Sequence, residues 1–105
     1  MVHVHRVAKG IRRSYDKSLQ SQMNRAAQSI PTNIVEGRRQ ATDREFARFL
    51  RIALNSTTEL EYHLMAGRDI DAISDHDSDA LTREAIEVRK MLYGLLRTLG
   101  NSSDA

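Results

Sequence analysis

Apolar residues recur every three or four positions through three long stretches of this chain, and this spacing limits its possible folds more than any other feature. Such a period places the apolar side chains on one face of an α-helix, whereas a half-buried strand alternates at every second position. The chain also has a single proline and few β-branched runs, which favours helices. We therefore predict an all-α protein.

The most legible stretch begins at Thr42. Thr42-Asp-Arg-Glu45 has the sequence of a capping box, in which the threonine hydroxyl accepts from the Glu45 backbone N–H while the glutamate carboxylate reaches back. A helix is expected to start here. Its apolar positions are Phe46, Leu50, Ala53, Leu60 and Leu64, and Thr57 fills the remaining position of the stripe. Phe49 and Ile52 widen it.

A second stripe precedes the end of the chain. Its members are Leu81, Ala85, Val88, Leu92, Leu95 and Leu99, flanked by Met91 and Leu96. Asp75, Asp77 and Asp79 stand before it, where carboxylates favour the positive end of a helix dipole. Gly100 is expected to end this helix, and residues 101–105 are expected to form a disordered tail.

The third stripe contains the proline. It consists of Leu19, Met23, Ala26, Ala27, Ile30 and Ile34. Pro31 removes one backbone donor, so the helix should kink or break there, and we favour a kink because Ile30 would be a poor N-cap. Gly37 is predicted to end this helix in the left-handed conformation. The link that follows is short, which makes the helices on either side antiparallel neighbours.

The first segment supports only two or three helical turns, with Val4, Val7 or Ala8, and Ile11 as its apolar positions. We predict an up-down four-helix bundle with a short first helix, folded as one domain over residues 1–100. A short helix cannot fill a position as long as its neighbours, so a groove or an apolar stripe should remain exposed. That favours self-association.

The composition excludes several classes of protein. With no cysteine, the chain has no thiol nucleophile, no disulfide framework and no cysteine-based zinc site. No apolar run approaches the roughly 18 residues of a membrane span, and the first residues lack the apolar stretch of a signal peptide. We expect a soluble, cytoplasmic protein.

Charge is distributed unevenly along the chain. Residues 1–51 hold 11 Lys/Arg against 4 Asp/Glu, a net of +7, whereas residues 52–105 hold 5 against 10, a net of −5. This asymmetry fits two kinds of partner: a polyanion bound by the basic half, or a second subunit whose acidic half packs against it. Composition alone does not decide between them.

A row of arginines stands out on the helix that follows Thr42. Like charges spaced by four residues slightly destabilise an isolated helix, so helix stability does not explain this row of arginines. Phosphate groups or an acidic partner would compensate the repulsion between the charges. The candidate nucleic-acid-binding residues are Arg38, Arg39, Arg44, Arg48 and Arg51, together with Arg12 and Arg13. Phe46 and Phe49 belong to the apolar face, so contacts should be made to the backbone rather than by base stacking.

Six polar residues lie on or beside the apolar stripes around Pro31 and after Thr42. They are Arg25, Asn33, Glu36, Glu45, Ser56 and Glu59. No histidine accompanies them except His63 at the far end, so we interpret them as a buried or half-buried hydrogen-bond network that fixes the helix register rather than as a catalytic site.

The spacing also argues against metal sites. A di-iron bundle needs a histidine three residues after a glutamate, but Tyr62 occupies that position after Glu59. The acidic run from Asp75 resembles the start of a calcium loop, but Ala80 and Ile86 replace the required glycine and glutamate. We expect no metal, no cofactor and no enzymatic activity.

Residues 22–37 and 44–61 carry a resemblance to a known family, with Ser-Ile-Pro-x-Asn-Ile-x-Glu-Gly at 29–37 as its marker. The chain resembles the bacterial four-helix-bundle proteins encoded in intervening sequences of large-subunit ribosomal RNA genes, closely over residues 19–73. Distant relatives are the accessory variability proteins of diversity-generating retroelements. Those proteins form pentameric barrels with a basic surface and engage reverse transcriptase and nucleic acid.

The resemblance implies a homo-oligomeric four-helix bundle, pentameric by analogy, with no known catalysis. It places Gly67 inside the third helix, which then runs to about Ile70, and it puts Asp71 where relatives usually have a turn glycine and Asn55 where they often have glycine. Relatives usually have a longer first helix, of which only the end is expected here.

Two functions remain open at this point. The first is a non-enzymatic homo-oligomer that binds structured RNA or DNA through a basic face, as an accessory to a reverse-transcriptase-like partner. The alternative is a structural or adaptor oligomer in which the basic half packs against the acidic half of the neighbouring subunit, with no nucleic-acid role.

Overall fold

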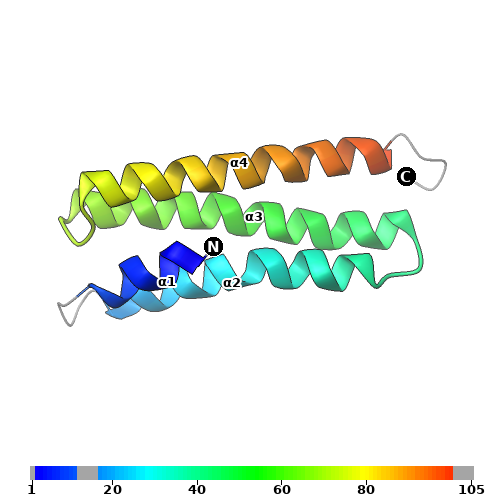
Figure 1. The fold of residues 1–105 in the computed structure, drawn as a ribbon. Helices are drawn as coiled ribbons and strands as arrows, with labels where there is room; N and C mark the ends of the chain where they lie inside the picture. Colours follow the sequence, from blue (N-terminus) through cyan, green and yellow to red (C-terminus); the bar gives the residue numbers. More distant parts are fainter. Residues whose placement is uncertain (1, 12–16, 101–105) are drawn as a thin grey trace.

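The fold consists of four helices (Figure 1). The computed structural model describes residues 2–11 and 17–100, in which α1 spans Val2–Lys9, α2 Lys17–Arg38, α3 Asp43–Asp69 and α4 Asp75–Gly100. Successive helices run antiparallel along a body of 50 × 20 × 17 Å, and the described residues contain no strand. The predicted all-α bundle with a short first helix is confirmed, while the predicted tail at 101–105 lies outside the described residues.

The central helix is α3, which lies between α2 and α4 and packs against both (Figure 1). The short α1 packs on α2 and touches α4, and it covers only one half of the bundle. We call this part the four-helix half. The other part, which holds the link between α2 and α3 and the C-terminal end of α4, is the three-helix half.

The buried core differs between the two halves. The large cluster belongs to the four-helix half and consists of Val4, Ile11, Met23, Ala26, Ala27, Ile30, Leu60, Leu64, Ile73, Leu81 and Ala85. In the three-helix half the buried cluster is formed by Leu50, Ala53 and Leu92, with partly buried neighbours around it. The predicted stripes of α2, α3 and the first part of α4 therefore form the core.

The end of α4 departs from the prediction. Leu96 packs against the small cluster, whereas Leu95, which was assigned to the stripe, is 40% exposed. Val88 and Leu95 are seven residues apart and share one side of α4, and this side faces α1 near His3. α1 packs only on the first part of α4, so among the described residues α1 does not cover Leu95. Ile52, expected to widen the α3 stripe, is also exposed.

The start of α3 follows the capping-box prediction in part. Thr42 is the N-cap, and its hydroxyl accepts from the Glu45 backbone N–H at 3.2 Å. The Glu45 carboxylate does not reach back but accepts from Arg48 at 3.3 Å. At the other end the helix stops at Asp69, one residue before the expected Ile70, which serves as the C-cap.

The turn from α3 to α4 contains the one non-glycine residue with positive φ among the described residues, Asp71 at 59°. A β-carbon is disfavoured in this left-handed region, where glycine is favoured. The resemblance described above placed a turn glycine at this position, and the backbone conformation is one that favours glycine. Ser74 then caps α4 by accepting from the Asp77 backbone N–H at 3.1 Å.

The prediction for Gly37 is wrong. It lies inside α2, which runs through Pro31 to Arg38 without a break, and none of the described glycines has a positive φ. Gly37 is instead buried where α2 crosses α3, because a β-carbon there would come within 2.8 Å of Phe46 and 2.9 Å of Phe49. The glycine allows the two helices to approach each other closely.

Candidate nucleic-acid interface

Five of the predicted arginines lie together at the end of the three-helix half. Arg38 ends α2, Arg39 opens the link, and Arg44, Arg48 and Arg51 follow on the first three turns of α3. All five residues are exposed. They are one group because the link between α2 and α3 is short and turns the chain back on itself (Figure 1). We call this group the basic end.

Ion pairs compensate the basic end only weakly. Arg39 lies 3.8 Å from Glu36, and Arg48 lies 3.3 Å from Glu45 and 4.6 Å from the centre of the Phe49 ring. Exposed pairs of this kind contribute less than about 1 kcal/mol. Within the described part of the chain, Arg38, Arg44 and Arg51 have no carboxylate within 4.0 Å. Their charges are therefore free to meet an anion.

A small cavity separates two of these arginines. It has a volume of about 160 Å³ and is lined by Arg44, Ala47 and Arg51 of α3 and by Leu96 and Gly100 of α4. Arg44 and Arg51 are seven residues apart, about two helical turns, and the small residue Ala47 lies between them in the sequence. None of the described residues that line this cavity carries a carboxylate.

The remaining basic candidates do not join this group. Arg12 and Arg13 lie outside the described residues. Another basic residue, Lys17, begins α2 at the opposite end of the bundle, roughly 30 Å from Arg38 along the helix.

The polar residues between α2 and α3 form two separate sets of contacts. The first is half-buried: the Ser56 hydroxyl donates to the Ser29 hydroxyl at 2.8 Å, and the Asn33 amide donates to the same hydroxyl at 3.0 Å. Ser29 was not among the predicted residues of this set, because its partner Ser56 lies on another helix, 27 residues away in the sequence. This set links α2 to α3 directly.

The second set is more exposed. Arg25 donates to Glu59 at 2.6 Å, and the Glu59 carboxylate also lies 3.7 Å from His63 Nε2, a buried nitrogen with no hydrogen-bond partner in the structure. Glu36 and Glu45 belong to neither set, because each pairs with an arginine three residues further along the chain. For these two residues the predicted interhelical network is wrong.

Sequence reasoning also missed an aromatic residue beside the arginines. Tyr62 is 60% exposed and lies eleven residues after Arg51, which is about three helical turns, so the two share a side of α3. Helical spacing alone predicts that Tyr62 lies on the same side of α3 as Arg51.

Other kinds of site are not found in residues 2–11 and 17–100. No group of three or more histidine, aspartate or glutamate side chains is placed to hold a metal ion. No helix in this part combines the length and the apolar character needed to cross a bilayer.

Comparison with known families agrees with the resemblance noted above. The model of the 23S rRNA-intervening sequence protein family matches residues 1–94. The chain belongs to this family. No curated protein matches the chain.

A solved structure with a similar fold comes from Bacteroides thetaiotaomicron, described as a protein of unknown function from the S23 ribosomal protein family. The two chains superpose with a TM-score of 0.82 at 22% identity, over 90% of this chain and 89% of the other. This similarity supports the fold and carries no statement about function.

Proposed function

We propose that this intervening-sequence protein is a non-enzymatic homo-oligomer that binds structured RNA or DNA through the phosphate backbone, using the basic end. The observation that supports the proposal is the convergence of five exposed arginines from α2 and α3, three of them without a carboxylate partner in the described residues. Phosphate contacts of this kind dominate affinity for nucleic acid and make it depend on salt.

The exposed apolar residues of the three-helix half support self-association. Val35 on α2 and Met91 and Leu95 on α4 are 57%, 66% and 40% exposed, in the half of the bundle that α1 does not cover. Burying such side chains against another subunit would remove apolar surface from water.

A second candidate is the adaptor oligomer, and one observation favours it. The turn between α3 and α4 and the start of α4 carry Asp69, Asp71, Asp75, Asp77 and Asp79, at the end of the molecule opposite the basic end. Head-to-tail packing would bring the two charges together and leave no arginines free for nucleic acid.

Light scattering after size exclusion separates the two candidates. The purified protein is run at low and at high salt, with and without a hairpin RNA. Nucleic-acid binding predicts an oligomer whose mass does not change with salt and which binds RNA at low salt only. An oligomer that dissociates in high salt and ignores RNA at every salt concentration would support the adaptor and contradict the proposal.

A further inference from the structure

The small cavity at the basic end brings two arginines to one hollow of the surface. Arg44 and Arg51 line it from α3, and Leu96 and Gly100 line it from α4. Within the described residues, neither guanidinium group has a carboxylate within 4.0 Å, and neither takes part in a side-chain hydrogen bond. Their donors are therefore available to a ligand that enters the cavity.

The volume of this cavity limits the size of the ligand. Small-molecule sites usually enclose roughly 300–1,000 Å³. The cavity, at about 160 Å³, is smaller than this range. It suits a single small group, such as a phosphate, and not a base together with its sugar.

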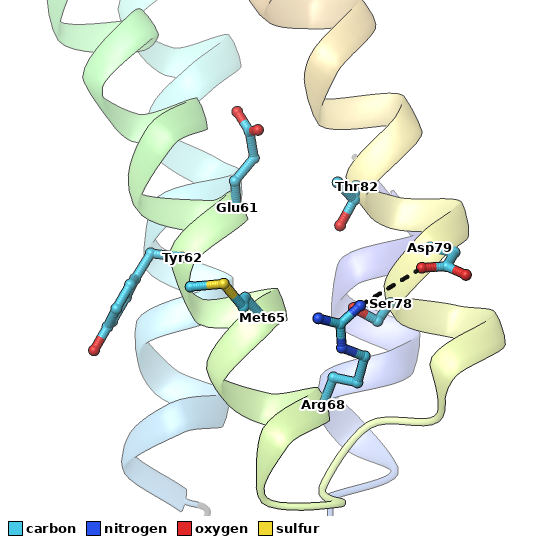
Figure 2. Close-up of a pocket in the computed structure, with 7 residues that line it drawn as sticks. All are labelled: Glu61, Tyr62, Met65, Arg68, Ser78, Asp79 and Thr82. Carbon is cyan, nitrogen blue, oxygen red and sulfur yellow. Dashed lines mark ion pairs between the residues drawn. The ribbon is translucent and has the colours of Figure 1, made fainter.

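A larger cavity further along α3 and α4 has a different electrostatic character (Figure 2). Its volume is about 320 Å³, and its wall contains the carboxylates of Glu61 and Asp79. Arg68 lies 3.9 Å from Asp79, and Arg89 holds Glu61 at 3.1 Å, so each of these cations faces a carboxylate. Tyr62 also lines this cavity, but its ring points away from Arg68 and Asp79 (Figure 2). By contrast, the described residues of the small cavity supply cations without a carboxylate, which favours an anion.

The charge of the small cavity matches a terminal phosphate better than an internal one. Arg44 and Arg51 together supply two positive charges. A phosphomonoester at the end of a strand carries about −1.5 to −2 charges at pH 7 and presents three acceptor oxygens, whereas each internal phosphodiester carries a single negative charge. The internal group is also attached to a sugar on either side, which hinders its entry into a narrow cavity.

A competing role for these two arginines is to cap the end of α4. The last carbonyl groups of a helix have no partner within the helix, and a nearby arginine can donate to them. Among the described residues, however, neither Arg44 nor Arg51 donates to a carbonyl of α4. The two cations instead offset the negative end of the helix dipole, which would otherwise repel an anion.

We propose that the small cavity at the basic end binds a phosphomonoester at the end of a nucleic-acid strand. Arg44 and Arg51 donate to its oxygens, while the other arginines of the basic end contact neighbouring internal phosphates. The inference rests on the proposed function and adds to it a preference for strands that end in a phosphate over strands that end in a hydroxyl group.

Binding is measured by fluorescence anisotropy at low salt with a set of matched hairpin RNAs. The first ends in hydroxyl groups, two others carry a phosphate at the 5′ or the 3′ end, and a fourth has one extra nucleotide and hydroxyl ends. The fourth hairpin adds an internal phosphate without a phosphomonoester. At least one terminal phosphate is expected to tighten binding about tenfold, as for a hydrogen bond to a charged group, and the extra nucleotide much less.

Two double variants locate the source of this gain. Arg44→Gln/Arg51→Gln should remove the gain from the terminal phosphate. Arg38→Gln/Arg39→Gln, which changes two exposed arginines of the basic end that do not line the cavity, should weaken the binding of every hairpin but keep the gain. Circular dichroism checks that both variants are folded, as expected for exposed positions.

The outcomes separate this inference from the proposed function. If the hydroxyl-ended hairpin binds in a salt-dependent way but no terminal phosphate adds more affinity than the extra nucleotide, the inference is wrong and the proposed function stands. The inference is equally overturned if Arg44→Gln/Arg51→Gln keeps the gain or if Arg38→Gln/Arg39→Gln loses it. Inorganic phosphate that removes the gain at micromolar concentration would show that the cavity prefers the free ion, which also overturns the inference. If no hairpin binds, both fail.

Discussion

The two halves of this bundle are built from the same helices but are packed differently. In the four-helix half, α1 covers the groove between α2 and α4, and a large cluster from all four helices is buried. In the three-helix half that cover is missing and the buried cluster is small. Exposed apolar side chains occur in both halves, such as Met91 in this half and Ile70 in the other. The arginines lie at the end of this second half.

The difference suggests a division of labour. Apolar burial is the main stabilising term in folding, so the four-helix half contributes most of the stability. The three-helix half contributes less and carries charges that the fold itself does not need. The following substitutions test this division, from the largest expected effect to the smallest.

The largest effects are expected from truncating buried leucines, with a clear difference between the halves. Leu60→Ala in the large cluster should cost about 3–5 kcal/mol of unfolding free energy, since the surrounding side chains cannot collapse into the cavity. Leu92→Ala in the small cluster should cost nearer 2 kcal/mol, because its partly exposed neighbours can move. Urea unfolding measures both. An equal cost in the two halves would contradict the division.

Glycine-to-alanine substitutions at the contacts between helices also compare the two halves. Gly37→Ala should cost about 1–3 kcal/mol, because the new methyl group would meet the Phe49 β-carbon, which cannot move unless α3 moves. Gly67→Ala, at the opposite end of the same helix pair, should cost less, since the nearest atom is the flexible tip of Ile73. Gly94→Ala is the control.

Nothing lies within 4 Å of a β-carbon at Gly94, so alanine should stabilise α4 by up to about 1 kcal/mol through helix propensity. Thermal unfolding of the three variants gives their order. If Gly37→Ala lowers the melting temperature no more than Gly67→Ala does, the close approach of α2 and α3 at Gly37 is not rigid.

Replacing Asp71 should strengthen the four-helix half. Asp71→Gly is expected to raise stability by about 1 kcal/mol, because it relieves the left-handed backbone at φ 59°. Asp69→Gly, on the last residue of α3, is the matched control and should destabilise the helix end instead. A neutral or destabilising Asp71→Gly, seen by chemical unfolding, would show that the Asp71 side chain contributes more than its backbone costs.

The smallest effect is expected at the exposed Arg25–Glu59 pair. Its side chains are 62% and 38% exposed, so Arg25→Ala should cost less than about 1 kcal/mol. Ser29→Ala, which removes the half-buried link to Ser56, should cost about 1 kcal/mol or slightly more. The reverse order in thermal unfolding would mean that the exposed pair, and not the serine contact, joins the two helices.

Much of the fold could be predicted from the sequence because helical spacing reports directly on burial. The stripes of α2 and α3 and the Thr42 cap were predicted from local rules. The errors at Gly37 and Leu95 have one cause: each depends on which neighbouring helix is present at that level, and spacing within one helix does not contain this information.

The candidate site could be predicted in part. The arginines of α3 follow from a four-three spacing, and the link between the helices explains why Arg38 and Arg39 join them. The cavity between α3 and α4 that Tyr62 lines could not be predicted, because α4 supplies part of its wall. The α4 residues, such as Asp79 and Thr82, are distant from Tyr62 in the sequence. The contact of Ser56 with Ser29 was missed for the same reason.

The most direct test of the basic end compares two double charge reversals. Arg44→Glu/Arg51→Glu changes two arginines on α3 that are seven residues apart and have no carboxylate partner among the described residues. Arg83→Glu/Lys90→Glu changes two exposed cations with the same spacing on α4. Hairpin RNA affinity is measured between about 50 and 200 mM salt. We expect the α3 variant to lose binding and most of its salt dependence, and the α4 variant to keep both. Equal binding by the α3 variant and the unmodified protein would contradict the account.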